Sequence, residues 1–281
     1  MSRFHFTQTD VQRLESQAQQ LRRDIVSMIY AAKAGHPGGS LSAVEMITAL
    51  YFHVMNIDPS NPDWLERDRF VLSKGHACPA LYAALARRGY FDPALLNTLR
   101  QYKSILQGHP DMNKVPGLDM STGSLGNGLS IGLGMALSAK LHRQNYTTYV
   151  MLGDGEIQEG MVWEAAMAAN HHDLKNLIAI VDCNGVQING WTNDIMTLEP
   201  IADKWKAFGW AVVEVNGHNM KDVLTALHTA GTMRKPTVIL MRTVKGKGVS
   251  FMEDESKWHG AAPSEEELVK ALSEINMGGV V

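Results

Sequence analysis

Two polar residues that follow apolar runs of the sequence are suited to holding a divalent cation. Asp154 stands between Gly153 and Gly155 after one run, and Asn184 ends the next run, followed by Gly185. One carboxylate and one amide oxygen suit Mg²⁺, which takes few protein ligands and adds phosphate oxygens and water. A Gly-Asp-Gly triplet alone is more often a plain turn, but an asparagine at the matching strand end favours the cation site. The glycines would let the backbone approach a diphosphate.

The sequence contains 11 histidines, and we single out four that lie in the predicted glycine-rich or proline-rich motifs Gly-His-Pro-Gly, Lys-Gly-His, Gly-His-Pro and Trp-His-Gly. These four are His36, His76, His109 and His259. Imidazole moves protons near neutral pH and donates hydrogen bonds to phosphate or to developing negative charge. The pattern predicts a histidine-lined site, whereas His171 and His172, on the polar end of a predicted helix, are interpreted as structural.

Other charged residues near these motifs allow two interpretations. The segment Lys245-Gly-Lys-Gly248 is either a phosphate clamp or a solvated loop, and its spacing does not decide between them. Glu156 and Glu159 follow the Gly-Asp-Gly turn, where acidic residues usually complement the dipole at the start of a helix.

The elements that must position these residues begin with a helix over 10–34, capped by Thr9 or Asp10 and ended by the Gly-His-Pro-Gly-Gly segment 35–39. A second helix starts at Ser40 or Ser42. A short buried strand over 70–72 then leads into Ser-Lys-Gly-His. Residues 101–127 show no clear periodicity, and such long irregular stretches are usually functional.

The best-defined unit is a strand over 149–152, a helix over 160–172 and a strand over 177–181. Two strands joined by one helix should be parallel with a right-handed crossover, so Asp154 and Asn184 should meet at one edge of the sheet. Further strands are predicted over 210–215 and 237–241, and further helices over 129–141, 220–233 and 264–275. We therefore expect one α/β domain over residues 1–281, with a mostly parallel sheet covered by helices on both faces.

Composition narrows the class of protein. Of the 281 residues, 45% are apolar and 20% are charged, as in ordinary globular proteins, which excludes a disordered chain. The net charge of −3 gives no reason to expect nucleic acid or a membrane surface as partner. Two cysteines, Cys78 and Cys183, are too few for a disulfide framework and predict packing residues in a reducing cytoplasm.

Taken together, these motifs resemble the thiamine-diphosphate enzymes, and specifically the N-terminal, diphosphate-binding part of the transketolase family. The cofactor signature runs from the Gly-Asp-Gly at 153–155 to the Asn-Gly at 184–185. The more specific marks follow in transketolase order: Lys33-Ala-Gly-His-Pro-Gly38, Leu72-Ser-Lys-Gly-His76, Gly108-His-Pro110, Thr122-Gly-Ser-Leu-Gly126 and Trp258-His-Gly260. Asn127 stands where the family more usually has glutamine.

The resemblance implies thiamine diphosphate with Mg²⁺ or Ca²⁺ as cofactors. The implied metal ligands are Asp154, Asn184 and the carbonyl oxygen of Val186. The implied cofactor contacts are His76, Ser124, Leu125, Gly153, Gly155, Glu156, Asn184 and His259. The implied catalytic residues are His36, His109 and His259, and Glu159 resembles a glutamate that couples two active sites. The implied reaction moves a two-carbon ketol unit between sugar phosphates.

The resemblance also implies a partner chain. Transketolases continue into pyrimidine-binding and C-terminal domains, which carry the glutamate that activates the cofactor, and this sequence matches neither. We expect a C-terminal transketolase subunit to supply them, in an α₂β₂ assembly.

Four alternatives remain open. The α subunit of a 2-oxo acid dehydrogenase shares the Gly-Asp-Gly and Asn-Gly motifs but not the histidine motifs, and a deoxyxylulose-phosphate synthase lacks the proline at position 37. A non-catalytic transketolase remnant is disfavoured because all four histidines are intact. A flavodoxin-like nucleotide-binding module would need an early phosphate loop that the sequence lacks.

Overall fold

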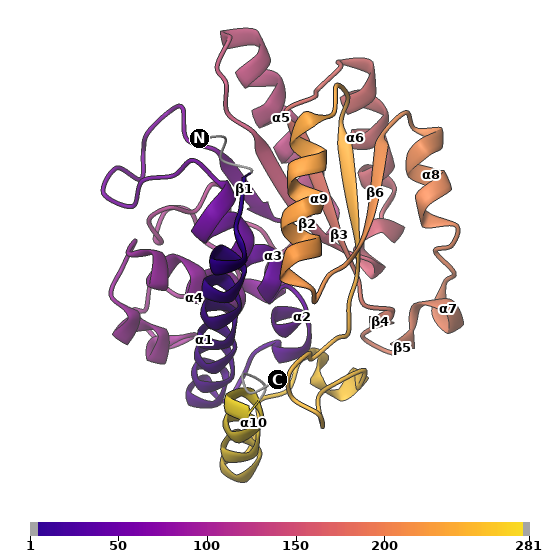
Figure 1. Ribbon diagram of the computed structural model, residues 1–281. Helices are drawn as coiled ribbons and strands as arrows, with labels where there is room; N and C mark the ends of the chain where they lie inside the picture. Colours follow the sequence, from indigo (N-terminus) through magenta and orange to yellow (C-terminus); the bar gives the residue numbers. More distant parts are fainter. Residues whose placement is uncertain (1–4, 278–281) are drawn as a thin grey trace.

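The computed structural model describes residues 5–277, and there it contains a five-stranded sheet in which all neighbouring strands run parallel (Figure 1). Across the sheet, the strands are β1 (Arg69–Leu72), β2 (Thr148–Gly153), β3 (Leu177–Cys183), β7 (Thr237–Arg242) and β6 (Ala211–Asn216). All five were predicted, with ends that differ by one or two residues. The sequence did not predict the strand order, in which β7 lies between β3 and β6, and β6 forms an edge of the sheet.

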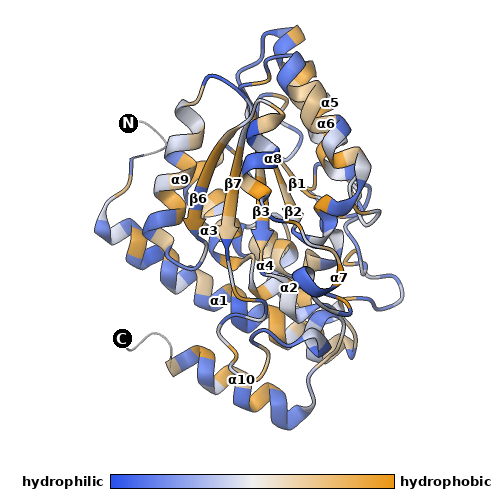
Figure 2. Cartoon of the chain, turned by 90° about the vertical axis from the view of Figure 1, so that its right-hand side faces the viewer, coloured by the Kyte–Doolittle hydropathy of each residue, from blue (hydrophilic) through white to orange (hydrophobic). Residues whose placement is uncertain are grey.

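Alternate strand residues enter two different hydrophobic clusters, one on each face of the sheet. On β2, Tyr149 and Met151 belong to one cluster, while Val150 and Leu152 belong to the other. All four side chains are fully buried, so the sheet has no solvated face along this strand. Figure 2 shows the apolar strands between helices on both sides. The predicted fold class, an α/β sheet covered on both faces, is therefore confirmed.

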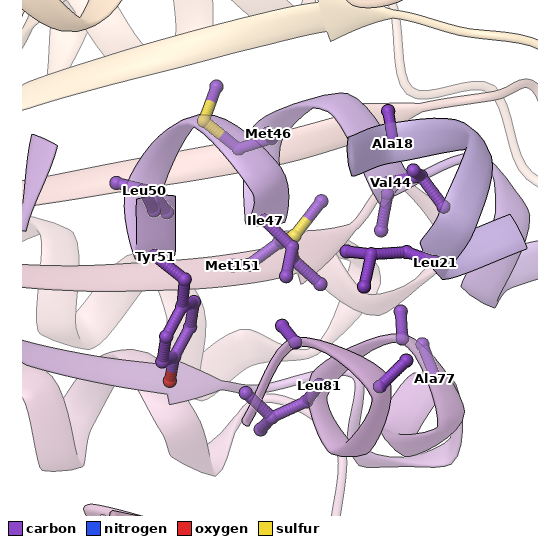
Figure 3. Packing of buried hydrophobic residues seen from close by; sticks show 14 of the residues in the cluster. Ala18, Leu21, Val44, Met46, Ile47, Leu50, Tyr51, Ala77, Leu81 and Met151 are labelled. Carbon is purple, nitrogen blue, oxygen red and sulfur yellow. The ribbon is translucent and has the colours of Figure 1, made fainter. Parts of the chain in front are cut away.

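The larger cluster lies under the helices of the first half of the chain and α9. These helices are α1 (Gln8–Ala32), α2 (Pro37–Leu41), α3 (Val44–Ala49), α4 (Cys78–Arg88) and α9 (Met220–Thr232). Figure 3 shows Leu21 of α1, Ile47 of α3 and Leu81 of α4 packed together beside Met151 of β2. Because α3 and α4 are buried in this cluster, the loops at their N-terminal ends are held firmly above the sheet edge.

The second cluster lies under α5 (Asn127–His142), α6 (Gly160–His171) and α8 (Ile201–Ala207). Three tryptophans join α6 and α8 to the chain before β6. The rings of Trp163 and Trp205 lie 5.2 Å apart between centroids, and those of Trp205 and Trp210 lie 4.8 Å apart. These contacts fix α6, whose N-terminal end follows the Gly-Asp-Gly turn.

Two predicted helix starts were wrong. The cap of α1 is Thr7, whose hydroxyl accepts from the Asp10 backbone N–H, while the Asp10 carboxylate accepts from the Thr7 N–H. Asp10 is therefore the third helical residue of a capping box. Pro37 begins α2 instead of ending a helix, because proline fits the first helical position, where its missing N–H costs nothing.

Several short elements were not predicted. They are the hairpin of β4 (Val186–Gln187) and β5 (Gly190–Trp191), the helix α7 (Thr192–Ile195), 3₁₀ turns over 75–77, 93–98, 155–158 and 256–259, and a π-helical turn over 50–54. The stretch predicted to be irregular is so from 99 to 126. At the C-terminal end, α10 (Glu265–Met277) lies beside α1, below it in Figure 1. No helix among residues 5–277 is long and apolar enough to span a membrane.

Candidate active site

A cavity of about 380 Å³ opens at the carboxyl ends of the strands. Its walls come from the start of α2, the loop after β1, the turn after β2, the β4–β5 hairpin and the loop after β7. This is the edge where parallel α/β sheets bind ligands. In Figure 1 it is the lower edge of the sheet, where α2 and the β4–β5 hairpin lie.

Asp154 and the segment that follows β3 meet at this edge, as predicted. Gly153 is in register with Asp182 on the neighbouring strand. The two carboxylate oxygens of Asp154 accept backbone N–H bonds from Gly155 at 2.7 Å and from Gly185 at 2.6 Å. Burial, and then the nearby charge of Asp182, raises the pKa of Asp154 to about 6. A bound cation would compensate for both effects.

Asn184 and Val186 present oxygen atoms beside Asp154. The Asn184 side-chain oxygen accepts the Val186 backbone N–H at 3.1 Å, and the Val186 carbonyl oxygen accepts from the Lys245 ammonium at 2.8 Å. Among residues 5–277, no three His, Cys, Asp or Glu side chains gather as a metal site. The oxygens available are one carboxylate, one amide and one carbonyl, a set that suits Mg²⁺ or Ca²⁺ better than zinc.

Three of the four predicted histidines form one cluster. The ring centroids of His36 and His76 lie 5.2 Å apart, those of His76 and His259 lie 5.0 Å apart, and those of His36 and His259 lie 5.6 Å apart. Each comes from a different segment: the residue before α2, the 3₁₀ turn after β1 and the 3₁₀ turn over 256–259. All three line the cavity.

These histidines are neutral at pH 7. Burial, followed by the charge of Arg100, lowers the pKa of His36 to about 4, and burial, followed by the charge of Lys245, lowers the pKa of His259 to about 4. Burial also lowers the pKa of His76 well below its usual range. A neutral imidazole has one nitrogen that donates and one that accepts, as proton transfer to and from hydroxyls requires.

We expect the folded protein to lose stability as pH falls from about 6.5 to about 4. In this range the unfolded chain protonates His36 and His259, whose pKa is about 4 in the fold, so the unfolded state binds more protons and acid favours it. Thermal unfolding midpoints measured from pH 7 to pH 4.5 should fall less steeply for His36→Asn/His259→Asn than for wild type. His172→Asn, at the exposed end of α6, is the control. An identical slope in the double variant would contradict the prediction.

His109 and the loop residues predicted beside the cofactor lie near the cavity to different degrees. Leu125 lines it and is 37% exposed. His109 packs its ring against Gly123, another lining residue, where a Cβ atom would lie 3.0 Å from the ring. Ser124 is exposed and is not among the lining residues. Of these three, only Leu125 therefore borders the cavity directly.

The two glutamates after the turn have different environments. Glu156 is buried, and its carboxylate accepts from the Ser73 hydroxyl, the Gly126 N–H at 2.9 Å and the Gly153 N–H at 3.0 Å. It therefore joins three loops that border the cavity. Glu159 is exposed, in contrast to Glu156.

Two lysines lie in the cavity wall. Sequence reasoning left the role of Lys245 open and assigned no role to Lys74. Lys245 is 2% exposed and donates to Val186, while Lys247 pairs with Glu253 near the surface at 3.2 Å. The clamp interpretation therefore fits Lys245 and the solvated interpretation fits Lys247. Lys74 is also 2% exposed and borders the cavity, and its place between Ser73 and His76 was the available signal.

Comparisons with known proteins identify the family of this chain. Residues 14–278 match the family described as transketolase, thiamine diphosphate binding domain. The chain is 46% identical to one of the subunits of the apulose-4-phosphate transketolase of Phocaeicola vulgatus, over 95% of both chains. It is 47% identical to the SqwG subunit of the 6-deoxy-6-sulfo-D-fructose transketolase of a Clostridium species, over 95% of this chain and 97% of that one.

A solved structure, the transketolase of Campylobacter jejuni, matches with a TM-score of 0.89 and 34% identity. The match covers 94% of this chain but only 42% of that longer transketolase. The resemblance seen in the sequence therefore extends to the whole described fold.

Proposed function

This chain belongs to the transketolase family, as its thiamine-diphosphate-binding domain, and we propose that it is the cofactor-binding subunit of a two-chain transketolase. The assembled enzyme would move a two-carbon ketol unit from a ketose phosphate to an aldose phosphate. The observation that carries this proposal is one cavity that joins the oxygens of Asp154, Asn184 and Val186 to three neutral histidines. The alternative, an α subunit of a 2-oxo acid dehydrogenase, does not explain the Gly-His-Pro-Gly, Lys-Gly-His and Trp-His-Gly motifs that carry these histidines.

The cavity fits thiamine diphosphate and a divalent cation. Asp154, Asn184 and the Val186 carbonyl would hold Mg²⁺, or Ca²⁺, and diphosphate oxygens would complete its shell. Gly153 and Gly155 border the cavity without side chains, so a diphosphate could approach the backbone there. When bound, the cofactor supplies the electron sink that cleavage of the bond beside the ketone requires.

The histidines would act on the sugar and on the diphosphate. We assign His36, His109 and His259 to the hydroxyls of the ketose, where a neutral imidazole can hold a hydroxyl and move its proton as charge develops. His76 faces the same space and is assigned to the diphosphate, with Gly155. His259 is assigned to both groups, as the family resemblance implies, and its Nδ1 lies 3.0 Å from the Lys245 ammonium.

The remaining assignments concern the cofactor rings and the partner. Leu125 and Ser124 are assigned to the cofactor's ring side, and Glu156 to the support of the loops around it. Glu159 is assigned to coupling between two active sites, as the family resemblance implies, and its exposed position would let it meet a second subunit.

The rest of the active site would come from a second chain. We propose a C-terminal transketolase subunit with a pyrimidine-binding domain, in an α₂β₂ assembly, because the relatives that match over nearly their whole length are named as subunits. Residues 1–281 would then form a single diphosphate-binding domain. Both cysteines are unpaired and buried, which fits a reducing cytoplasm.

A reconstitution experiment tests this function. The chain and the candidate partner are purified separately and assayed, alone and mixed, for ketol transfer with thiamine diphosphate, Mg²⁺ and several ketose and aldose phosphates. We expect activity only in the mixture. Activity of this chain alone would overturn the two-chain proposal, and inactivity of every mixture would favour the non-catalytic alternative.

A further inference from the structure

A buried carboxylate that the proposed reaction does not use lies directly beneath the candidate cation site. Asp182 ends β3, is fully buried and does not line the cavity. Four side chains from four separate segments donate to it. They are Ser42 at 2.6 Å, Lys74 at 2.5 Å, Asn184 at 2.9 Å and Thr243 at 2.5 Å.

These bonds are divided unequally between the two oxygens of Asp182. Oδ1 accepts from Thr243 alone, whereas Oδ2 accepts from Ser42, Lys74 and the Asn184 amide nitrogen. The Lys74 ammonium also donates to the Gly39 carbonyl at 2.9 Å, so the buried charge pair has additional polar support.

The bond to Asn184 fixes which way that amide faces. An amide group has an acceptor on one side and two donors on the other. With its nitrogen bound to Asp182, the Asn184 oxygen must face the opposite side, where it meets the Val186 N–H at 3.1 Å. Rotation of the amide by half a turn would present N–H donors, which cannot bind a cation.

We propose that Asp182 is a positioning residue for the cation site and acts by holding the Asn184 amide with its oxygen toward the metal. The inference rests on the proposed function, because it assumes that Asn184 is a metal ligand. Mutation of a residue that is hydrogen-bonded to a metal ligand typically lowers metal affinity by about 10- to 100-fold. Asp182 does not line the cavity where cofactor and sugar are proposed to bind, so its effect should appear in cation binding itself.

Two matched double variants isolate this effect. Replacing Asp182 alone would leave the buried Lys74 charge without a partner and destabilise the fold, so Lys74 is replaced as well. Lys74→Met/Asp182→Leu removes every acceptor for the Asn184 amide nitrogen. Lys74→Met/Asp182→Asn also removes the charge pair but keeps one carbonyl oxygen that can accept from Asn184.

The measurement is calorimetric titration of Mg²⁺ into the full chain with its partner chain, at saturating thiamine diphosphate. We expect the leucine variant to bind Mg²⁺ at least about tenfold more weakly than the asparagine variant. Unfolding midpoints without metal check that both variants fold. Equal affinities in the two variants would overturn the inference, whereas failure of the wild type to bind Mg²⁺ would overturn the proposed cation site itself.

A single variant keeps the test decisive if the leucine variant does not fold. Asn184→Asp adds a negative charge at the cation site, which by itself should strengthen Mg²⁺ binding. It also replaces the amide donor with a carboxylate beside Asp182, and two adjacent carboxylates repel. We expect weaker Mg²⁺ binding than in wild type, and equal or tighter binding would contradict a positioning role for Asp182.

Discussion

Asp154→Ala should lower Mg²⁺ affinity by at least about 100-fold and remove ketol transfer by the assembled enzyme. Asp154 is the one carboxylate among the three oxygens proposed to hold the cation, and it is 5% exposed in the wall of the cavity. Without it, the site keeps the ammonium groups of Lys74 and Lys245 but no carboxylate among the oxygens proposed to hold the metal. Titration calorimetry with Mg²⁺ and an activity assay at increasing Mg²⁺ measure the two effects.

Two controls separate this effect from loss of folding. Asp154→Asn keeps an oxygen for one of the backbone N–H bonds from Gly155 and Gly185, so it should fold normally while still binding Mg²⁺ poorly. Asp203→Ala removes an exposed carboxylate on α8 and should behave as wild type. EDTA should inactivate the wild type reversibly. Full activity of Asp154→Ala at low Mg²⁺ would show that Asp154 is not a metal ligand.

His259→Ala should lower kcat of the assembled enzyme by about 10²- to 10⁴-fold, the usual range for loss of a proton-transferring side chain. The ring of His259 contacts both His36 and His76, and its Nδ1 faces the Lys245 ammonium. Its removal therefore takes away one proposed hydroxyl contact and one partner of Lys245. Steady-state kinetics should show the loss in kcat, and titration with thiamine diphosphate should also show weaker cofactor binding, because His259 is assigned to the diphosphate as well.

His36→Ala should have a similar effect, and the double variant His36→Ala/His259→Ala should lose less than the sum of the two free-energy changes. Residues that act on one substrate as a unit are not additive, and these two rings lie 5.6 Å apart. His172→Ala, on the exposed end of α6, is the matched control and should keep full activity. Unchanged kcat in His36→Ala and His259→Ala would remove the histidines from the proposed mechanism.

The local pattern of the sequence was sufficient for the strands and most helices. The run over 149–152, before Asp154, is apolar at every position, as a strand buried on both faces requires, and the structure places it in β2. The pairing of Asp154 with the end of β3 also followed from the sequence, because a strand, helix and strand close together must bring both carboxyl ends to one edge. Short elements such as the β4–β5 hairpin carry too few residues for a periodic signal.

The chemistry of the site was determined partly by the sequence. Residue types and motif order identified the family and predicted both the oxygens proposed to hold the cation and the four histidines, because these depend on which groups are present. Whether Lys245 faces solvent or the cavity depends on the fold, since the same Lys-Gly-Lys-Gly segment places Lys245 inside and Lys247 near the surface. The gathering of His36, His76 and His259 likewise depends on three segments far apart in the chain.

Only the tertiary structure revealed the role of Asp182. Its four donors come from positions 42, 74, 184 and 243, and no spacing rule connects such distant residues. In the sequence, Asp182 is one polar residue at the end of a strand. In the fold it is fully buried, and burial strengthens each of its hydrogen bonds and the attraction to its charge partner. The sequence thus determined which groups the site contains, and packing decided which way they face.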